Sequence, residues 1–278
     1  MLDFKDMLHA EFTSNSFRII FLGLIFLWGI SIGSFLNVVI LRVPKGESLI
    51  KRSSHCMTCG AKIRPIDLIP VFSWLMLRGK CHNCGEKISA RYPIVESLNG
   101  LLYVLTFWVL DINAKAIITC LLMSLLVVVA FMDWDTMEIN EIVLAIILAL
   151  AVPMHLLADD CVSIKSHILG ALVISVPFFI IGEVSRPIIK KKYGEDFRAI
   201  ELGDTLLMVA AGAVVGMRVI IVSTLIGLVA AAIGGVINKA VTKESKFAFG
   251  PFLSIGIAIG ALWGEKIADW YVGLLTFE

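Results

Sequence analysis

Long apolar stretches are the feature that most constrains this sequence. Each is close to the ~20 residues that an α-helix needs to cross the hydrocarbon core of a bilayer. They cover residues 17–41, 94–110, 114–132, 138–157, 164–182, 203–217, 219–237 and 250–272. Because 58% of the 278 residues are hydrophobic and only 17% are charged, a soluble globular protein is excluded. The sequence predicts an all-α polytopic membrane protein with about eight transmembrane helices.

The distribution of basic charge predicts how these helices are oriented. Most of the 24 lysines and arginines lie in three connecting segments, residues 42–93, 183–202 and 238–249. If all eight stretches cross the membrane, these segments share one side, and the positive-inside rule makes that side cytoplasmic. Both termini are then expected outside. No cleavage site follows the first stretch, so we expect it to be retained.

Two acidic clusters lie at the ends of apolar stretches, in residues 132–138 and 201–204. The predicted topology brings Asp133 and Asp204 to the same, cytoplasmic face. Carboxylates so close to hydrocarbon are costly and need a reason. Two carboxyl groups within a few ångströms share one proton and can position a water, which supplies an acid and a base together. The sequence therefore favours an intramembrane aspartic protease.

A second motif lies in the longest polar segment, where Cys-x-x-Cys-Gly-x-Lys-Ile occurs twice. Four thiolates from two such knuckles form a tetrahedral metal site. Structural disulfides are disfavoured in the cytoplasm, so the sequence predicts a bound zinc ion. Its predicted ligands are Cys56, Cys59, Cys81 and Cys84.

The expected division of the chain is residues 1–42 with the first helix, 43–93 with the zinc element, and 94–278 with the peptidase bundle.

Small-residue pairs at Gly-x-x-x-Gly spacing occur in three of the apolar stretches. They are Gly29 with Gly33, Gly212 with Gly216, and Gly256 with Gly260. Such pairs permit close approach of helices, and we expect ordinary packing at all three. Asn37 and Glu96 are polar groups within apolar stretches. Asn37 is expected to hydrogen-bond a neighbouring helix. Glu96 is expected either to line a polar site under the zinc element or to reach the membrane surface or pair with an arginine.

Taken together, these motifs resemble the bacterial type IV prepilin peptidases, which are aspartic proteases named for a Gly-x-Gly-Asp motif. The resemblance runs from about Gly29 to Gly216. Its motifs are residues 33–40 with Arg42 and Pro44, the paired Cys-x-x-Cys, residues 91–96, and the two aspartates in this order. It implies a helical membrane enzyme that cleaves the basic leader of prepilins and pseudopilins after a glycine at the cytoplasmic membrane face. Such enzymes usually methylate the new N-terminal residue from S-adenosylmethionine.

The resemblance assigns the catalytic pair to Asp133 and Asp204, with no metal in peptide cleavage. Asp133 rather than Asp135 matches the first family aspartate, because five residues separate it from Ile139, although Asn140 replaces the expected proline. The second motif departs further. Glu201 stands where the first glycine is expected and Leu206 where a lysine often follows. An active, divergent enzyme is the favoured interpretation.

The methyl-transfer step rests on the resemblance alone, since the chain has no Gly-rich dinucleotide loop. Arg42, Glu96 and Asn37 are the expected contacts of S-adenosylmethionine.

Expected partners are prepilin or pseudopilin substrates and membrane lipid, without nucleic acid; the oligomeric state stays open. The expected location is the bacterial inner membrane, with the zinc element and active site facing the cytoplasm. Alternatives are an ion-coupled transporter with a zinc-binding regulatory cap, and a peptidase without methyltransferase activity.

Overall fold

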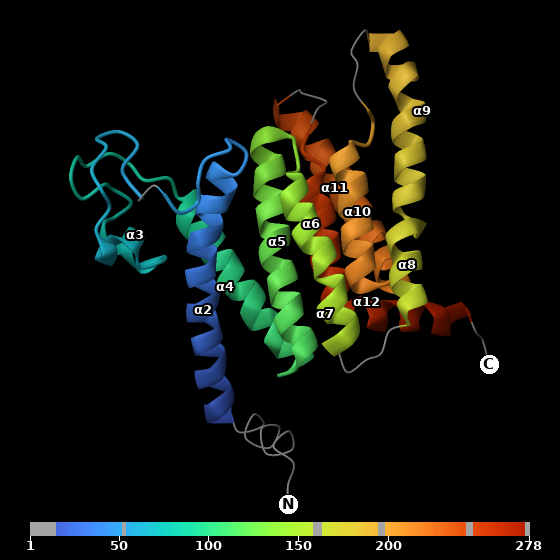
Figure 1. Cartoon of the computed structure of the whole chain (residues 1–278), viewed down its shortest axis with the longest axis horizontal. Coiled ribbons are helices and arrows are strands. Elements are labelled where there is room, and N and C mark those ends of the chain that lie inside the picture. The colour runs from blue at the N-terminus through green and yellow to red at the C-terminus, as the bar shows by residue number, and fades with distance from the viewer. Residues whose placement is uncertain (1–14, 52–53, 158–162, 194–197, 243–246, 276–278) are drawn as a thin grey trace, which may run out of the picture. The chain divides into compact units, whose positions relative to one another are not determined.

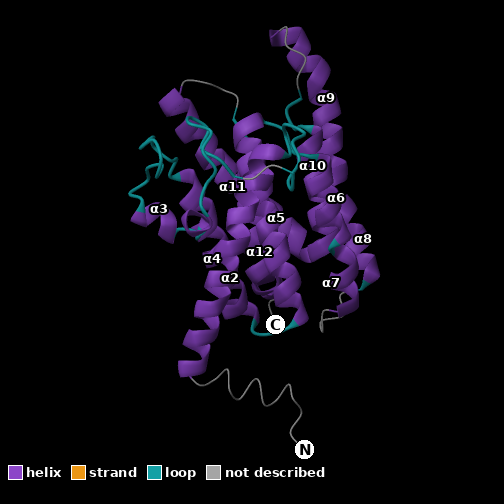
Figure 2. Cartoon of the chain, turned by 60° about the vertical axis from the view of Figure 1, so that its left-hand side comes forward, coloured by secondary structure: helices purple, strands orange, loops and turns teal. Residues whose placement is uncertain are grey.

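A computed structural model describes residues 15–51, 54–157, 163–193, 198–242 and 247–275. In the described residues the regular secondary structure is helical, with two isolated β-bridges and no strand (Figure 2). The predicted all-α fold is confirmed. The chain forms two compact units, residues 1–112 and 113–278. The expected three-part division stays a prediction.

The first unit is built on two long helices, α2 (Asn15–Arg42) and α4 (Arg91–Leu110) (Figure 1). Glycines allow them to pack closely, as expected. A Cβ added to Gly29 would lie 2.7 Å from the Cα of Gly100, and one added to Gly33 would lie 2.8 Å from the Cα of Glu96. The buried Asn99 amide donates to the Gly29 carbonyl at 2.7 Å, which satisfies a polar group at this interface.

Between these helices the chain forms a compact loop element with two short helices, η1 (Pro65–Leu68) and α3 (Phe72–Met76). It carries the paired cysteine motifs. Arg64 and Asp67 form a bidentate ion pair at the start of η1, with nitrogen to oxygen distances of 2.7 and 2.9 Å. The Trp74 indole donates to the Ile88 carbonyl at 3.1 Å, which joins α3 to the second cysteine knuckle.

The second unit is a helical bundle (Figure 1). Its helices are α5 (Ala114–Thr136), α6 (Glu141–Ala149), α7 (Ala151–Leu157), α8 (Ile164–Val173), α9 (Ser175–Tyr193), α10 (Leu202–Val215), α11 (Met217–Thr242) and α12 (Gly250–Leu275). Helix α5 forms much of the core, with Leu122, Met123 and Val129 fully buried. Helix α12 packs against α5, α10 and α11.

Two of the predicted membrane stretches are divided into two helices each, and prolines explain both breaks. Pro153 and Pro177 have no N–H to offer the carbonyls of Ala149 and Val173, the last residues of α6 and α8. Helix α9 then continues to Tyr193, well beyond the expected end at residue 182. Six helical segments of the described chain are long and apolar enough to cross a membrane. Residues 141–157 and 202–215 are shorter apolar helices, so the count of eight spans stays a prediction.

Glycines also bring the helices of the second unit together. Gly170 of α8 lies directly against Gly212 and Gly216 at the end of α10. Gly256 and Gly260 of α12 lie against Ser223 of α11. The packing roles expected of these glycines are confirmed, and the first contact holds α10 from the end opposite Asp204.

Candidate active site and metal centre

Asp133 lies in the last turn of α5, where this long apolar helix ends. Its side chain is buried, with 6% of the residue exposed. Met137 caps the helix in the left-handed conformation, with φ of 54°, and donates its N–H to the Asp133 carbonyl at 2.8 Å. Asn140 then caps the start of α6 by accepting the Ile142 N–H at 2.9 Å. Asparagine thus supplies a helix start where the family pattern has proline.

Asp204 lies in the first turn of α10, three residues after the N-cap residue Glu201. It is 5% exposed. Its carboxylate accepts the backbone N–H of Glu201, as in one half of a capping box. Gly203 gives this turn room, since a Cβ there would lie 3.2 Å from the Cβ of Ile139. The surviving Gly-Asp pair therefore places a buried acid at a helix N-terminus.

The two aspartates share one electrostatic environment. The charges of Asp133 and Glu201 both act on Asp204, and the charge of Glu201 also acts on Asp133. Helix α12 packs against both α5 and α10, the two helices that carry these acids. They belong to the same compact unit. The structure thus brings the two predicted catalytic residues together.

Gly250, the first residue of α12, is a further part of this site that the sequence did not reveal. Its N–H donates to the Asp133 Oδ2 atom at 2.7 Å. A Cβ at this position would lie 2.8 Å from Oδ2 and 3.1 Å from Cγ. A larger residue at this position would have to displace the Asp133 carboxyl group. A Gly-Pro pair at a helix start was the available signal.

The other acids near this site differ from the pair in burial. Asp135, Glu138, Glu141 and Glu201 are all exposed. The contrast between buried Asp133 and exposed Asp135 supports the choice between them made from the sequence. Burial therefore separates the aspartate pair from its four acidic neighbours in the sequence.

The four predicted zinc ligands come together in the first unit. The sulfur atoms of Cys56, Cys59, Cys81 and Cys84 all lie within 4.8 Å of one another. The Cys56 and Cys84 sulfurs are 3.8 Å apart, close to the ~3.8 Å edge of a tetrahedron with Zn–S bonds of about 2.3 Å. The donor set and its geometry fit a structural zinc ion.

The local fold of the two knuckles explains this convergence. In each, the N–H of the glycine bonds the carbonyl of the first cysteine at 2.9 Å. Those glycines, Gly60 and Gly85, have φ of 70° and 74°, in the left-handed region that glycine tolerates. The repeated sequence therefore folds into two repeated turns.

The pKa values of the cysteines also favour binding of a cation by the cluster. Hydrogen bonds from the backbone N–H groups of Cys59 and Thr58 lower the pKa of Cys56 to about 6. For Cys84, the backbone N–H of Glu86 acts to lower the pKa, but desolvation and the other three sulfurs outweigh it and raise the pKa to about 12. Four thiolates this close together repel one another, so they cannot all ionise easily. A bound divalent cation offsets that repulsion and stabilises the ionised form.

The three expected contacts of S-adenosylmethionine all lie in the first unit and already bond the protein. The buried Asn37 amide donates to the Tyr92 carbonyl at 3.1 Å. The Glu96 carboxylate accepts the Val71 N–H at 2.7 Å. Arg42 is half-buried and donates to the Ser48 carbonyl at 3.1 Å. Asn37 therefore joins α2 to α4, and Glu96 joins α4 to the zinc element.

Comparison with known proteins finds relatives that match most of the chain. Residues 27–110 match the bacterial peptidase A24 N-terminal domain, and residues 120–236 match the type IV leader peptidase family. A prepilin leader peptidase/N-methyltransferase of Aeromonas hydrophila is 32% identical, covering 91% of this chain and 94% of its own. The chain belongs to the type IV leader peptidase family. Both buried aspartates fall within the second match, and all four cysteines fall within the first.

Other relatives of the type IV leader peptidase family match nearly as well. The Neisseria gonorrhoeae prepilin leader peptidase/N-methyltransferase is 32% identical over 88% of this chain and 92% of its own. A type 4 prepilin-like proteins leader peptide-processing enzyme of Escherichia coli is 32% identical over 82% of this chain and 88% of its own. No solved structure matches the chain.

Proposed function

We propose that this chain is a membrane-embedded aspartic endopeptidase that removes the basic leader of type IV prepilins or pseudopilins after a glycine. N-methylation of the new N-terminal residue follows in our proposal. The observation that carries the peptidase assignment is the buried pair Asp133 and Asp204, each near one end of its helix and within electrostatic reach of the other. The names of the relatives support the substrate class and the second activity.

In the proposed cleavage, Asp133 and Asp204 hold one water between them, one carboxyl ionised and one protonated. The water oxygen attacks the scissile carbonyl carbon while the ionised carboxylate accepts a water proton. The protonated carboxyl donates a hydrogen bond to the carbonyl oxygen. When the tetrahedral intermediate collapses, the C–N bond breaks and the leaving nitrogen takes up the proton that the carboxylate accepted from the water. No covalent enzyme intermediate and no metal takes part.

The Gly250 N–H at the start of α12 supports this role for Asp133. It donates to the Oδ2 atom of the carboxylate, and in our proposal the Oδ1 atom bonds the water. The N-terminus of a helix also favours nearby negative charge. Asp204 receives a comparable bond from the Glu201 N–H. Each acid is thus oriented by a backbone donor that does not titrate.

The experiment that tests the peptidase assignment is cleavage of a prepilin by the detergent-solubilised protein, followed by mass spectrometry. We expect a mass loss equal to the leader. Asp133→Asn and Asp204→Asn should each lower the rate by about a thousandfold or more. Asp135→Asn, an exposed acid two residues away, is the matched control and should keep substantial activity. Wild-type cleavage by either of the first two variants would remove the proposal.

For the methyl transfer we propose that zinc, held by Cys56, Cys59, Cys81 and Cys84, orders the element between α2 and α4. S-adenosylmethionine, which supplies the methyl group, would be held in this unit by Arg42, Glu96 and Asn37. Among these, Arg42 has the stronger support, because it lies at the end of α2 and is half-buried. Each of the three also bonds a backbone group of the protein.

We further propose the bacterial inner membrane as the location, with both sites on the cytoplasmic side, both termini outside and lipid around the bundle. The distribution of basic residues supports this orientation. A transporter with a zinc cap has less support, because relay carboxylates should recur at mid-span depth, whereas Asp133 and Asp204 lie at helix ends.

A further inference from the structure

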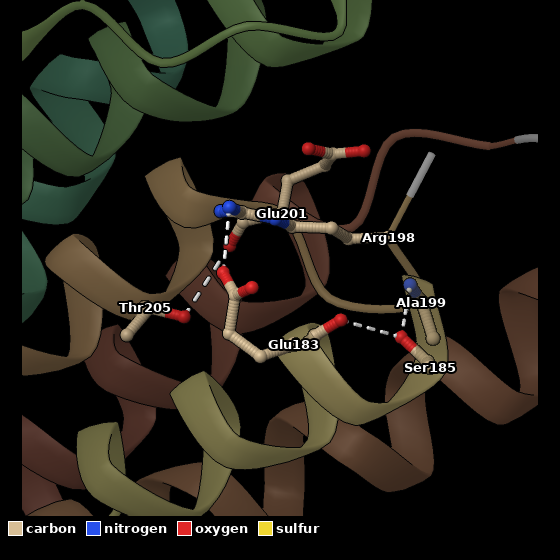
Figure 3. A network of polar contacts seen from close by, with 7 residues as sticks. Glu183, Ser185, Arg198, Ala199, Glu201 and Thr205 are labelled. Atoms are coloured by element: carbon tan, nitrogen blue, oxygen red, sulfur yellow. Dashed lines mark hydrogen bonds and ion pairs between the residues drawn. The ribbon is translucent and has the colours of Figure 1, made fainter. Parts of the chain in front are cut away.

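The segment that leads into α10 is held by a set of contacts to α9 that the sequence did not suggest (Figure 3). The Arg198 Nη2 atom lies 2.6 Å from the Glu183 Oε1 atom. The Ala199 N–H donates to the Ser185 hydroxyl at 3.0 Å, and that hydroxyl donates to the Gly182 carbonyl at 2.8 Å. We name these contacts between residues 182–185 and 198–200 the α9 latch.

Gly182 allows the backbone of α9 to approach the backbone of residue 200 closely. A Cβ at Gly182 would lie 2.8 Å from the Ile200 carbonyl oxygen. That oxygen belongs to the backbone, so any larger residue must push the whole segment away from α9. Ile200 immediately precedes Glu201, the N-cap residue of α10.

The N-cap residue Glu201 in turn bonds the first turn of α10, which carries the proposed catalytic acid Asp204. The Glu201 carbonyl accepts the Thr205 hydroxyl at 3.4 Å, and the Glu201 N–H bonds the Asp204 carboxylate. The donor that orients Asp204 is therefore one residue away from the segment that α9 holds.

We propose that the α9 latch is a positioning device that sets the location of the Glu201 N–H and, through it, the orientation of the Asp204 carboxylate. This inference rests on the proposed function. Gly182, Glu183, Ser185 and Arg198 are positioning residues that contact neither the peptide nor the water. A displacement of about 1 Å in a catalytic group can lower the rate by about a hundredfold, so small movements of this segment should slow catalysis.

Two kinds of variant test the latch in the full-length protein. Gly182→Ala forces the segment outward and should lower kcat by roughly thirtyfold to a hundredfold. Glu183→Gln removes one charge from a partly exposed ion pair and should lower kcat by roughly threefold to fivefold. KM should stay unchanged in both, because the substrate contacts remain. The double variant Glu183→Arg with Arg198→Glu should recover most of the Glu183→Gln loss.

A second measurement does not depend on activity. Hydrogen–deuterium exchange of a peptide covering residues 198–206 should be faster in Gly182→Ala and Glu183→Gln than in the wild type. Gly273→Ala is the matched glycine control, because nothing lies within 4 Å of a Cβ at that position. Lys191→Gln, an exposed position on α9, is the matched charge control. Neither should change kcat or the exchange.

Asp204→Asn is assayed in the same experiment, so that the proposal of the α9 latch and the peptidase assignment can be tested independently. Wild-type kcat and wild-type exchange in Gly182→Ala and Glu183→Gln, with Asp204→Asn inactive, would overturn the latch and leave the peptidase assignment intact. An active Asp204→Asn would overturn the peptidase assignment, and with it the catalytic role of the latch.

Discussion

The zinc element and the aspartate pair are assembled in opposite ways. The four cysteines come from one short stretch of chain, and each half of the site is a local turn closed by its own glycine. The two aspartates come from helices far apart in the sequence, and a third helix, α12, packs against both of those helices and bonds Asp133. In our proposal the first site depends on a metal for its stability, while the second depends on the packing of a helical bundle.

This difference predicts which changes each site tolerates. A cysteine knuckle should form wherever its own residues and zinc are present, so damage to it should stay within its own unit. The acid pair should respond to changes at distant positions in the second unit, including positions with no chemistry of their own.

The largest expected effect separates the two sites directly. Cys56→Ser removes one of four thiolates, and because metal binding supplies the folding free energy of such an element, zinc binding and methylation should both be lost. Leader cleavage should fall by no more than roughly threefold, since the aspartates lie in the other unit. Zinc content, methyl incorporation and leader cleavage are measured on one preparation. Retained methylation without zinc would contradict the ordering role of the metal.

The next effect tests how closely α12 fits Asp133. Gly250→Ala keeps the N–H but adds a methyl group against the Asp133 carboxyl group. We expect kcat for leader cleavage to fall by about thirtyfold, because a displaced catalytic group is costly. Gly273→Ala on the same helix serves as the control. Wild-type kcat in Gly250→Ala would show that the short contact has no catalytic role.

The smallest expected effect concerns Glu96, which bonds the zinc element to α4. Its partner Val71 has φ of 62°, a strained conformation for a β-branched residue. Glu96→Gln exchanges a charge-assisted bond for a neutral one, at a cost of about 1 kcal/mol. Hydrogen exchange in residues 69–76 should become faster and methylation slower, with cleavage unchanged. Glu47→Gln, an exposed acid in the same unit, is the control; an equal effect there would refute the specific role of Glu96.

Much of the fold could be read from the sequence because membrane helices and metal knuckles are local features. Apolar length marked all eight helical stretches, and cysteine spacing marked the zinc ligands. The helix boundaries were less well predicted. Hydropathy alone did not reveal that Pro153 and Pro177 divide two stretches, or that α9 continues through Arg186 and Pro187 to Tyr193, because a helix that leaves the membrane no longer needs apolar residues.

By itself the sequence determined that the protein is a helical membrane protein, that four cysteines form a metal-binding set, and that Asp133 and Asp204 lie at the ends of apolar stretches. Only the tertiary structure decided which groups touch those acids. The contact between Gly250 and Asp133, and the hold of α9 on the segment before Asp204, join residues from different helices. No periodicity or spacing along one chain specifies such contacts, because they depend on how separate helices pack around one another.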